Sequence, residues 1–199
     1  PFARVVCDGR ELELLREVLE TGWLTTGEKA LEFERRFAAY VGARHACAVN
    51  SCTSALHLAL EALGVGPGDK VLVPTWTFTA TAEVVRYLGA EPVIIDVDPQ
   101  TCLLTPEIVE SALIKHRDVK AIIVVHFGGQ PAEMIRVGGE GILSVCRRFG
   151  IRVVEDAAHA FPTRIGGSFV GTFGDITCFS FYANKTITAG EGGMLTTDD

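Results

Sequence analysis

The sequence lacks long apolar runs, clusters of basic residues and any recognisable export signal. Its longest apolar stretches, of about five or six residues, are far shorter than the roughly 20 that a membrane-spanning helix needs. The opening PFARVVCDGRELELL contains neither a long apolar core nor a cleavage site, so we expect no signal peptide. The net charge is −7, and no run of like charge occurs. We therefore expect neither a membrane nor a nucleic acid as a partner.

Paired cysteine motifs are also missing. The six cysteines, at positions 7, 47, 52, 102, 146 and 178, form no C-x-x-C pair and have no histidine cluster near them. The ligand spacing of a zinc site is thus absent, and we predict no metal site. Most of the cysteines lie in apolar stretches. This favours reduced, buried cysteines in a cytoplasmic protein.

What the sequence does contain is a regular alternation of helical and strand patterns over 199 residues, 48% of them hydrophobic. Several strands are apolar on both faces, which indicates a mostly parallel sheet covered on both sides. We predict an α/β fold, a three-layer α/β/α sandwich. The predicted helices cover 10–20, 28–40, 53–63, 79–88, a segment starting at Thr105 and Pro106, and 141–149. The predicted strands cover 45–50, 70–74, 92–97, 119–127, 151–156, 176–181 and 192–197.

In open α/β sheets, ligands bind beyond the carboxyl ends of the strands. Four polar or glycine-containing loops follow predicted strands, at 50–54, 74–79, 126–130 and 156–159. The first, NSCTS, opens a helix, whose free N–H groups and dipole favour phosphate. Ser51, Thr53 and Ser54 would add hydroxyl donors there. The alternative is plain helix capping by Ser51 or Thr53.

Asp156 ends an apolar strand, where an unpaired carboxylate is costly. A protonated pyridine nitrogen or a metal would suit it, and capping of a following helix is the alternative. His159, three residues on, would reach the same side through a helical turn, or serve structure alone. Trp76 and Phe78 follow a strand end, where they could stack on a flat ring or pack in the core.

Lys185 lies between a strand and the glycine-rich segment TAGEGG. A desolvated lysine attacks carbonyl compounds and pyridoxal phosphate (PLP), whereas a surface lysine on a loop is the alternative. Ser180 could face the same phosphate as the 50–54 loop. A phosphate loop, a stacking ring, a strand-end aspartate and a late lysine are together the parts that a PLP enzyme must supply.

The chain resembles the DegT/DnrJ/EryC1/StrS family of PLP-dependent sugar aminotransferases of fold type I. The similarity extends over essentially the whole chain. It rests on the segments GWLTTGEKALEFE, VNSCTSALHLAL, PTWTFTATA, EPVIIDVD, VVEDAAHA and FSFYANKTITAGEGGMLTTDD.

The resemblance implies a role for each matching residue. Lys185 matches the lysine that binds PLP covalently, and Asp156 the aspartate that pairs with the pyridine nitrogen. His159 matches a His or Gln position near the phenolic oxygen of the ring, and Phe78 the stacking aromatic. The phosphate-binding positions are matched by Thr53, Ser54 and Ser180. Cys52 stands where glycine or alanine is usual, and 136–141 resembles a short insertion.

The resemblance also implies partners and a domain plan. The partners would be an amino donor, L-glutamate, a nucleotide-linked keto sugar and a second copy of the chain in a homodimer. Residues 1–26 would form an N-terminal helix and arm, and 27–199 a large PLP-binding domain that is incomplete at its C-terminus. Family members run to nearly twice this length, so we expect a fragment without the small C-terminal domain.

Three alternatives remain at this stage. A non-catalytic PLP-binding or dimerisation module would bind cofactor but form no amine product. A PLP-dependent sugar dehydratase of the same family would carry histidine in place of Lys185. A dinucleotide-binding domain ranks last, because no G-x-G-x-x-G follows the first strand.

Overall fold

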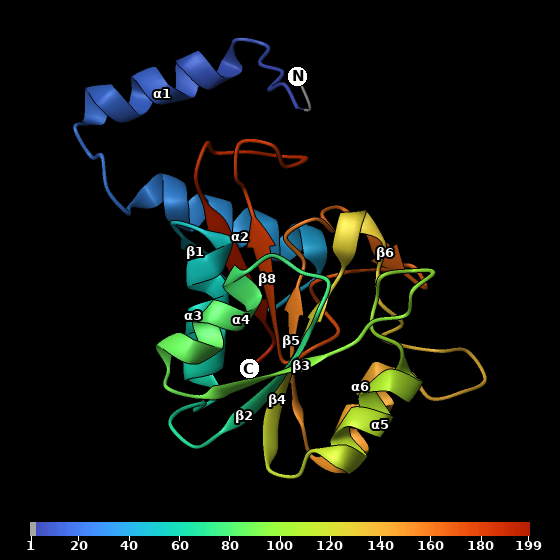
Figure 1. Cartoon of the computed structure of the whole chain (residues 1–199). Coiled ribbons are helices and arrows are strands. Elements are labelled where there is room, and N and C mark those ends of the chain that lie inside the picture. The colour runs from blue at the N-terminus through green and yellow to red at the C-terminus, as the bar shows by residue number, and fades with distance from the viewer. Residues whose placement is uncertain (1–2) are drawn as a thin grey trace.

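The computed structural model describes residues 3–199, and a seven-stranded sheet forms its centre (Figure 1). The strands are β1 (His45–Val49), β2 (Lys70–Pro74), β3 (Glu91–Ile95), β4 (Val119–Val125), β5 (Arg152–Asp156), β8 (Ile176–Ser180) and β9 (Gly193–Thr197). They lie in the order β1-β9-β8-β5-β4-β2-β3. Of these seven, β9 alone runs antiparallel to the other six, so the sheet is mostly parallel, as predicted.

Five helices cover the faces of the sheet. They are α2 (Glu28–Val41), α3 (Cys52–Ala62), α4 (Ala80–Tyr87), α5 (Pro106–Lys115) and α6 (Ile142–Phe149), and they follow an N-terminal helix, α1 (Arg10–Thr21). Ala121 and Ile123 of β4 face the core under α3 and α4, whereas Ile122 and Val124 face the core under α5 and α6. This alternation buries both faces of the strand and confirms the predicted α/β class.

The third core cluster lies under α2. Phe37 of α2 packs against Phe179 of β8, with ring centroids 5.0 Å apart. Phe181 joins the same aromatic group. This packing closes the end of the sheet that carries β8 and β9, next to the predicted reactive lysine.

The predicted helix ends are confirmed by their local geometry. Thr105 caps α5 by accepting a hydrogen bond from the N–H of Ile108, and Pro106 occupies the first turn. Gly22 and Gly42 end α1 and α2 with φ of 71° and 90°. Glycine adopts this left-handed conformation at little cost, which is why both helices stop there.

Two features differ from the predictions. A small hairpin, β6 (Arg164–Ile165) and β7 (Ser168–Phe169), was not predicted, because strands of two residues show no periodicity. The expectation that most cysteines are buried is wrong. All six are free, but Cys146 and Cys178 alone are fully buried, while Cys7 and Cys47 are exposed. An apolar neighbourhood in sequence did not decide burial, because β1 lies at the sheet edge.

The helix α1 lies apart from the sheet and has no buried residue (Figure 1). Its apolar side chains are exposed, with Leu12 68% and Leu19 67% accessible. The division into an arm (1–26) and a large domain (27–199) stays a prediction. No helix within residues 3–199 combines the length and the apolar character needed to cross a membrane.

Candidate active site

A cavity of about 490 Å³ lies at the sheet edge where the parallel strands end. Its walls come from the segments that follow β1, β2, β4, β5 and β8. It is lined by Thr53, Phe78, Asp156, His159, Ser180 and Lys185, which are six of the seven predicted site residues. The sequence rule for open α/β sheets thus located the cavity.

Lys185 lies in the loop between β8 and β9 and lines the cavity. Its backbone N–H donates to the carbonyl of Tyr182 at 2.9 Å. The chain then turns back through Gly190, whose φ is 81°, so that the N–H of Ala189 reaches the carbonyl of Phe181. Burial lowers the pKa of Lys185, and the nearby Cys52 and Asp156 oppose this shift. The lowered pKa makes the neutral, nucleophilic amine easier to form.

Asp156 is the last residue of β5 and is only 5% exposed. Its Oδ2 accepts a 3.0 Å hydrogen bond from the hydroxyl of Thr81, and its Oδ1 a 3.1 Å bond from the N–H of Ala158. Burial raises the pKa of Asp156 despite these hydrogen bonds. In the described chain the residues after Asp156 form a turn, so the alternative of a helix cap is wrong.

His159 lies in this turn, and the predicted helical turn from Asp156 is absent from the described residues. Both side chains still line the cavity. The Nδ1 of His159 accepts a hydrogen bond from the N–H of Gly128 at 3.3 Å, and its ring packs edge-on against Phe127. Burial lowers the pKa of His159, as does the charge of Lys185, while Asp156 raises it.

The start of α3 forms the corner of the cavity predicted to bind phosphate. Ser51 caps the helix by accepting from the N–H of Ser54 at 3.1 Å, which confirms the capping alternative for Ser51. Thr53 lines the cavity, but the Ser54 hydroxyl donates to Oδ1 of Asn50 at 2.6 Å and lies outside the lining. Within residues 3–199, the N–H groups of Cys52 and Thr53 have no acceptor, so they can bind an anion.

Two close neighbours complete this corner. A Cβ on Gly193 of β9 would lie 2.4 Å from the carbonyl carbon and oxygen of Ser51. Glycine is therefore needed for β9 to lie this close to the backbone of Ser51. Burial raises the pKa of Cys52 well above its ordinary value. Its thiol therefore stays protonated beside Lys185 and adds no charge to the cavity.

Phe78 and Trp76 do not pack in the core. Phe78 is 77% exposed and lines the cavity, whereas Trp76 is 51% exposed and packs edge-on against Phe127 with centroids 5.7 Å apart. Residues 75–77 form a bend, so the strand-like alternation that would place Trp76 and Phe78 on one face is absent there. Phe78 therefore has a free face toward the cavity.

Several cavity residues were missed by the sequence reasoning. Thr81 is fully buried on α4 among apolar neighbours, and a polar residue on an apolar helix face could have signalled a specific partner. Asn184 and Glu191 also line the cavity, but nothing in their sequence context marks them. In the part of the chain that the structure describes, no group of three metal-binding side chains comes together.

Comparison with known proteins gives the same family as the sequence motifs. Residues 6–199 match the DegT/DnrJ/EryC1/StrS aminotransferase family. The chain is 47% identical over 199 residues to the spore coat polysaccharide biosynthesis protein SpsC of Bacillus subtilis (strain 168), covering all of this chain and 49% of SpsC.

Solved structures share the fold over the whole chain. Spr1654 of Streptococcus pneumoniae, assigned as a sugar aminotransferase and solved in a PLP form, matches with a TM-score of 0.90 and 33% identity, covering 100% of this chain and 53% of Spr1654. DesI, solved in the presence of its TDP-sugar product, matches with a TM-score of 0.88 and 35% identity, covering 99% of this chain and 48% of DesI. The chain spans about half the length of these relatives.

Proposed function

Because the chain belongs to the DegT/DnrJ/EryC1/StrS aminotransferase family, we propose that it forms the PLP-binding part of a sugar aminotransferase. In this proposal an amino group passes from L-glutamate to a nucleotide-linked keto sugar. One observation carries the proposal: Lys185 and Asp156 line the same cavity as the open N-terminus of α3. We further propose that 27–199 belong to the large domain and that 1–26 form its arm.

The residues of the cavity fit PLP in their chemistry. Lys185 offers an amine to the aldehyde, and Asp156 a carboxylate to the ring nitrogen. The free N–H groups of Cys52 and Thr53 suit the phosphate, with the hydroxyls of Thr53 and Ser180 beside them. Phe78 exposes an aromatic face of the right kind for a flat ring. Ser54 stays a proposed phosphate contact, and in this structure its hydroxyl donates to Oδ1 of Asn50.

When bound, PLP would supply an electron-poor ring that takes up the charge left on the substrate carbon after a proton is removed. Asp156 would hold a proton on the ring nitrogen, since a buried carboxylate strongly favours a cationic partner. Lys185 would take the proton from the substrate carbon and return it. Its lowered pKa supports this role, because a general base must lose its own proton near neutral pH.

His159 would donate a hydrogen bond to the cofactor ring. Its Nδ1 accepts the N–H of Gly128, so the neutral ring carries its proton on Nε2. That N–H would donate to the phenolic oxygen of the ring. The lowered pKa of His159 keeps the imidazole neutral, so it can donate without adding a charge.

The substrate class is proposed from the relatives. SpsC is named for polysaccharide biosynthesis, and DesI was solved with a TDP-sugar. We propose a nucleotide-linked keto sugar as the acceptor and amino-sugar or polysaccharide biosynthesis as the role. Free cysteines throughout fit a reducing compartment such as the cytoplasm. The apolar residues exposed on α1 support a homodimer.

The decisive experiment traps the cofactor. Full-length protein is mixed with PLP, reduced with borohydride and digested, and the modified peptide is identified by mass spectrometry. We expect the label on Lys185. Lys185→Arg should lose both the label and turnover, while Lys115→Ala, an exposed lysine at the end of α5, should keep both. Retained turnover in Lys185→Arg would contradict the role of Lys185 as the lysine that binds PLP.

A second candidate is a PLP-binding module that does not turn over, because the contacts described above suffice for holding the cofactor without identifying a substrate site. The two candidates differ in product, not in cofactor binding. Incubation with glutamate and nucleotide-linked keto sugars should yield an amino sugar if the transferase proposal is right. Labelled Lys185 with no amine product from any keto sugar would favour the module instead.

A further inference from the structure

A buried histidine–glutamate pair lies at the wall of the cavity, which His126 lines, and has no part in the proposed chemistry. His126, just after β4, and Glu155, on β5, are both fully buried, and Nε2 of the histidine lies 2.9 Å from Oε2 of the glutamate. Glu155 neighbours Asp156 in sequence, but its side chain points to the opposite face of the sheet. Burying such a pair is costly unless every polar atom finds a partner.

Glu155 has a complete set of partners. Its Oε1 accepts hydrogen bonds from the N–H of Gly174 at 2.7 Å, the hydroxyl of Thr177 at 2.8 Å and the N–H of Phe173 at 3.2 Å. Burial alone would raise the pKa of Glu155, but the hydrogen bonds, led by that from His126, lower it. The carboxylate therefore stays ionised and accepts from all sides.

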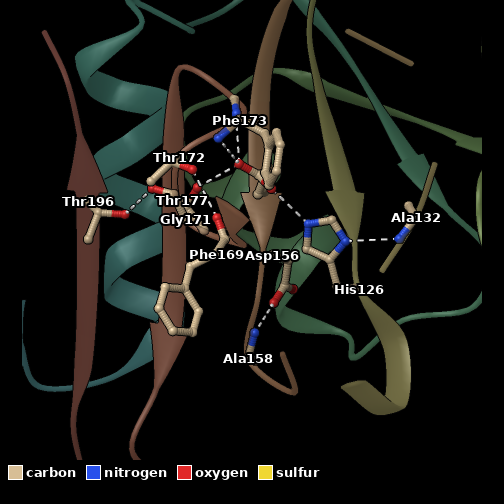
Figure 2. Close-up of polar contacts among 12 residues, drawn as sticks. His126, Ala132, Asp156, Ala158, Phe169, Gly171, Thr172, Phe173, Thr177 and Thr196 are labelled. Atoms are coloured by element: carbon tan, nitrogen blue, oxygen red, sulfur yellow. Dashed lines mark hydrogen bonds and ion pairs between the residues drawn. The ribbon is translucent and has the colours of Figure 1, made fainter. Parts of the chain in front are cut away.

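The hydrogen bonds fix the protonation of His126. Its Nδ1 lies 3.0 Å from the backbone nitrogen of Ala132, which is a donor, so Nδ1 must accept (Figure 2). The ring proton is then on Nε2 and points at Glu155. His126 is thus neutral and hydrogen-bonded on both sides. Glu155 fixes its tautomer, and this tautomer can accept the hydrogen bond from Ala132.

The segment held between His126 and Ala132 begins at the wall of the cavity, which Phe127 lines. We call residues 127–132 the wall segment; it includes the short 3₁₀ turn η1 (Phe127–Gly129). Phe127 packs against the ring of His159 at 5.4 Å, and the N–H of Gly128 donates to Nδ1 of His159. The backbone N–H of His126 also donates to the carbonyl of Asp156 at 3.0 Å.

We propose that Glu155 is a positioning residue that acts through His126 to hold the wall segment, and with it His159, in the cavity. The proposal deepens the function proposed above and rests on it, since His159 is there assigned a role toward the cofactor. The contacts run in one unbroken series from the Glu155 carboxylate to the His159 ring. Other partners in the site, such as Thr81 on Asp156, lie on the opposite face of the sheet.

Glu155→Gln is the informative substitution, because it keeps the shape and changes one acceptor into a donor. Its amide oxygen can still accept from Phe173, Gly174 and Thr177. Its NH₂ then faces Nε2 of His126, which must release its proton and carry it on Nδ1 instead. Nδ1 would then be a donor facing the N–H of Ala132, which is also a donor. The hydrogen bond between His126 and Ala132 would be lost, and the wall segment would no longer be held there.

The first measurement uses the cofactor-free, full-length protein. We expect amide hydrogen exchange at Gly128 and Ala132 to become about tenfold faster in Glu155→Gln, as for the loss of one buried hydrogen bond. We also expect the nitrogen NMR signals of His126 to exchange their protonated and unprotonated positions. Unchanged exchange at both amides, or faster exchange confined to Phe173 and Gly174, would overturn the proposal.

The second measurement adds PLP and follows the pH midpoint of its visible absorption. The midpoint should shift in Glu155→Gln, because His159 is no longer held. Thr196→Val is the matched control: it removes a buried 3.1 Å hydrogen bond to the carbonyl of Gly171 (Figure 2), away from the wall segment. It should leave the midpoint and both amides unchanged. An unshifted midpoint in Glu155→Gln would show a merely structural role and refute positioning.

If Glu155→Gln does not fold, Thr177→Val tests the same proposal. It removes one of the three donors to Oε1, so it should change exchange and midpoint in the same direction by a smaller factor. No change in either would count against the proposal. Failure of the proposed function has a different signature. In that case the wild-type protein, reduced with borohydride in the presence of PLP, would carry no label on Lys185.

Discussion

The Oγ1 hydroxyl of Thr81, on α4, donates a 3.0 Å hydrogen bond to Oδ2 of Asp156, at the end of β5. The two residues are 75 positions apart in sequence, and both are buried. The bond orients the carboxylate toward the cavity and favours its ionised form. The same hydroxyl lies 2.7 Å from that of Thr77, so a short hydroxyl chain leads from the cavity wall to the carboxylate.

We expect Thr81→Val to weaken PLP binding by about fivefold, because Asp156 loses a hydrogen bond worth about 1 kcal/mol. The shape of the side chain is kept, so the fold should persist. Titration of PLP by absorbance measures the effect. Thr172→Val, which removes a hydroxyl bonded to the carbonyl of Phe169, is the control and should bind PLP like the wild type. Equal affinities for all three proteins would show that Thr81 does not orient Asp156.

We expect Asp156→Asn to lower amino-transfer turnover by at least about 100-fold, because the amide cannot hold the ring nitrogen protonated. It should also change how stability depends on pH. The folded pKa of Asp156 is raised by burial, so its contribution to stability is full below the unfolded pKa and is lost as pH rises through the folded pKa.

Urea unfolding of the cofactor-free protein tests this sign. From about pH 4 upward, the wild type should lose stability relative to Asp156→Asn. The difference between the two proteins isolates this one carboxyl from Glu155, whose lowered pKa acts in the other direction. A difference that is flat with pH, or that grows in favour of the wild type, would contradict the buried state of Asp156.

We expect Gly193→Ala to destabilise the protein by about 2 kcal/mol, because its Cβ would overlap the backbone of Ser51 and overpack the site. PLP affinity should fall with it, since the shift displaces the start of α3. Urea unfolding and PLP titration measure the two effects. Gly66→Ala is the control, because a Cβ there meets nothing within 4 Å. A Gly193→Ala protein as stable as this control would mean that β9 and Ser51 are farther apart than described.

We expect Leu12→Gln combined with Leu19→Gln to weaken self-association without unfolding the chain. Both leucines are exposed on α1, so the free energy of unfolding of the monomer should change by no more than about 0.5 kcal/mol. A dimer that covers them would lose apolar contact area. Sedimentation velocity should show dimers for the wild type and more monomer for the variant. A wild type that is monomeric with PLP bound would refute the homodimer.

Local patterns were sufficient for the six α-helices, for the seven strands of the main sheet and for the edge of the sheet that carries the site, but not for the hairpin of β6 and β7. Helix stops at Gly22 and Gly42 follow from a conformation that glycine alone adopts cheaply. The two-sided apolar strand β4 indicated a covered parallel sheet. The resemblance located Lys185 and Asp156, and the structure brings them to one cavity. The helix start and the resemblance predict Ser54 beside the phosphate, and the structure adds that its hydroxyl donates to Asn50.

The sequence by itself determined the helices and the strands of the main sheet, because periodicities of 3.6 and 2 are local properties of the chain. It also determined where small, hydroxyl and charged residues follow the strands. Only the tertiary structure decided that Thr81 faces Asp156, that Gly193 passes Ser51, and that Glu155 selects the tautomer of His126. These contacts depend on the order of strands in the sheet, which is set by long-range packing and leaves no periodic signal in the residues themselves.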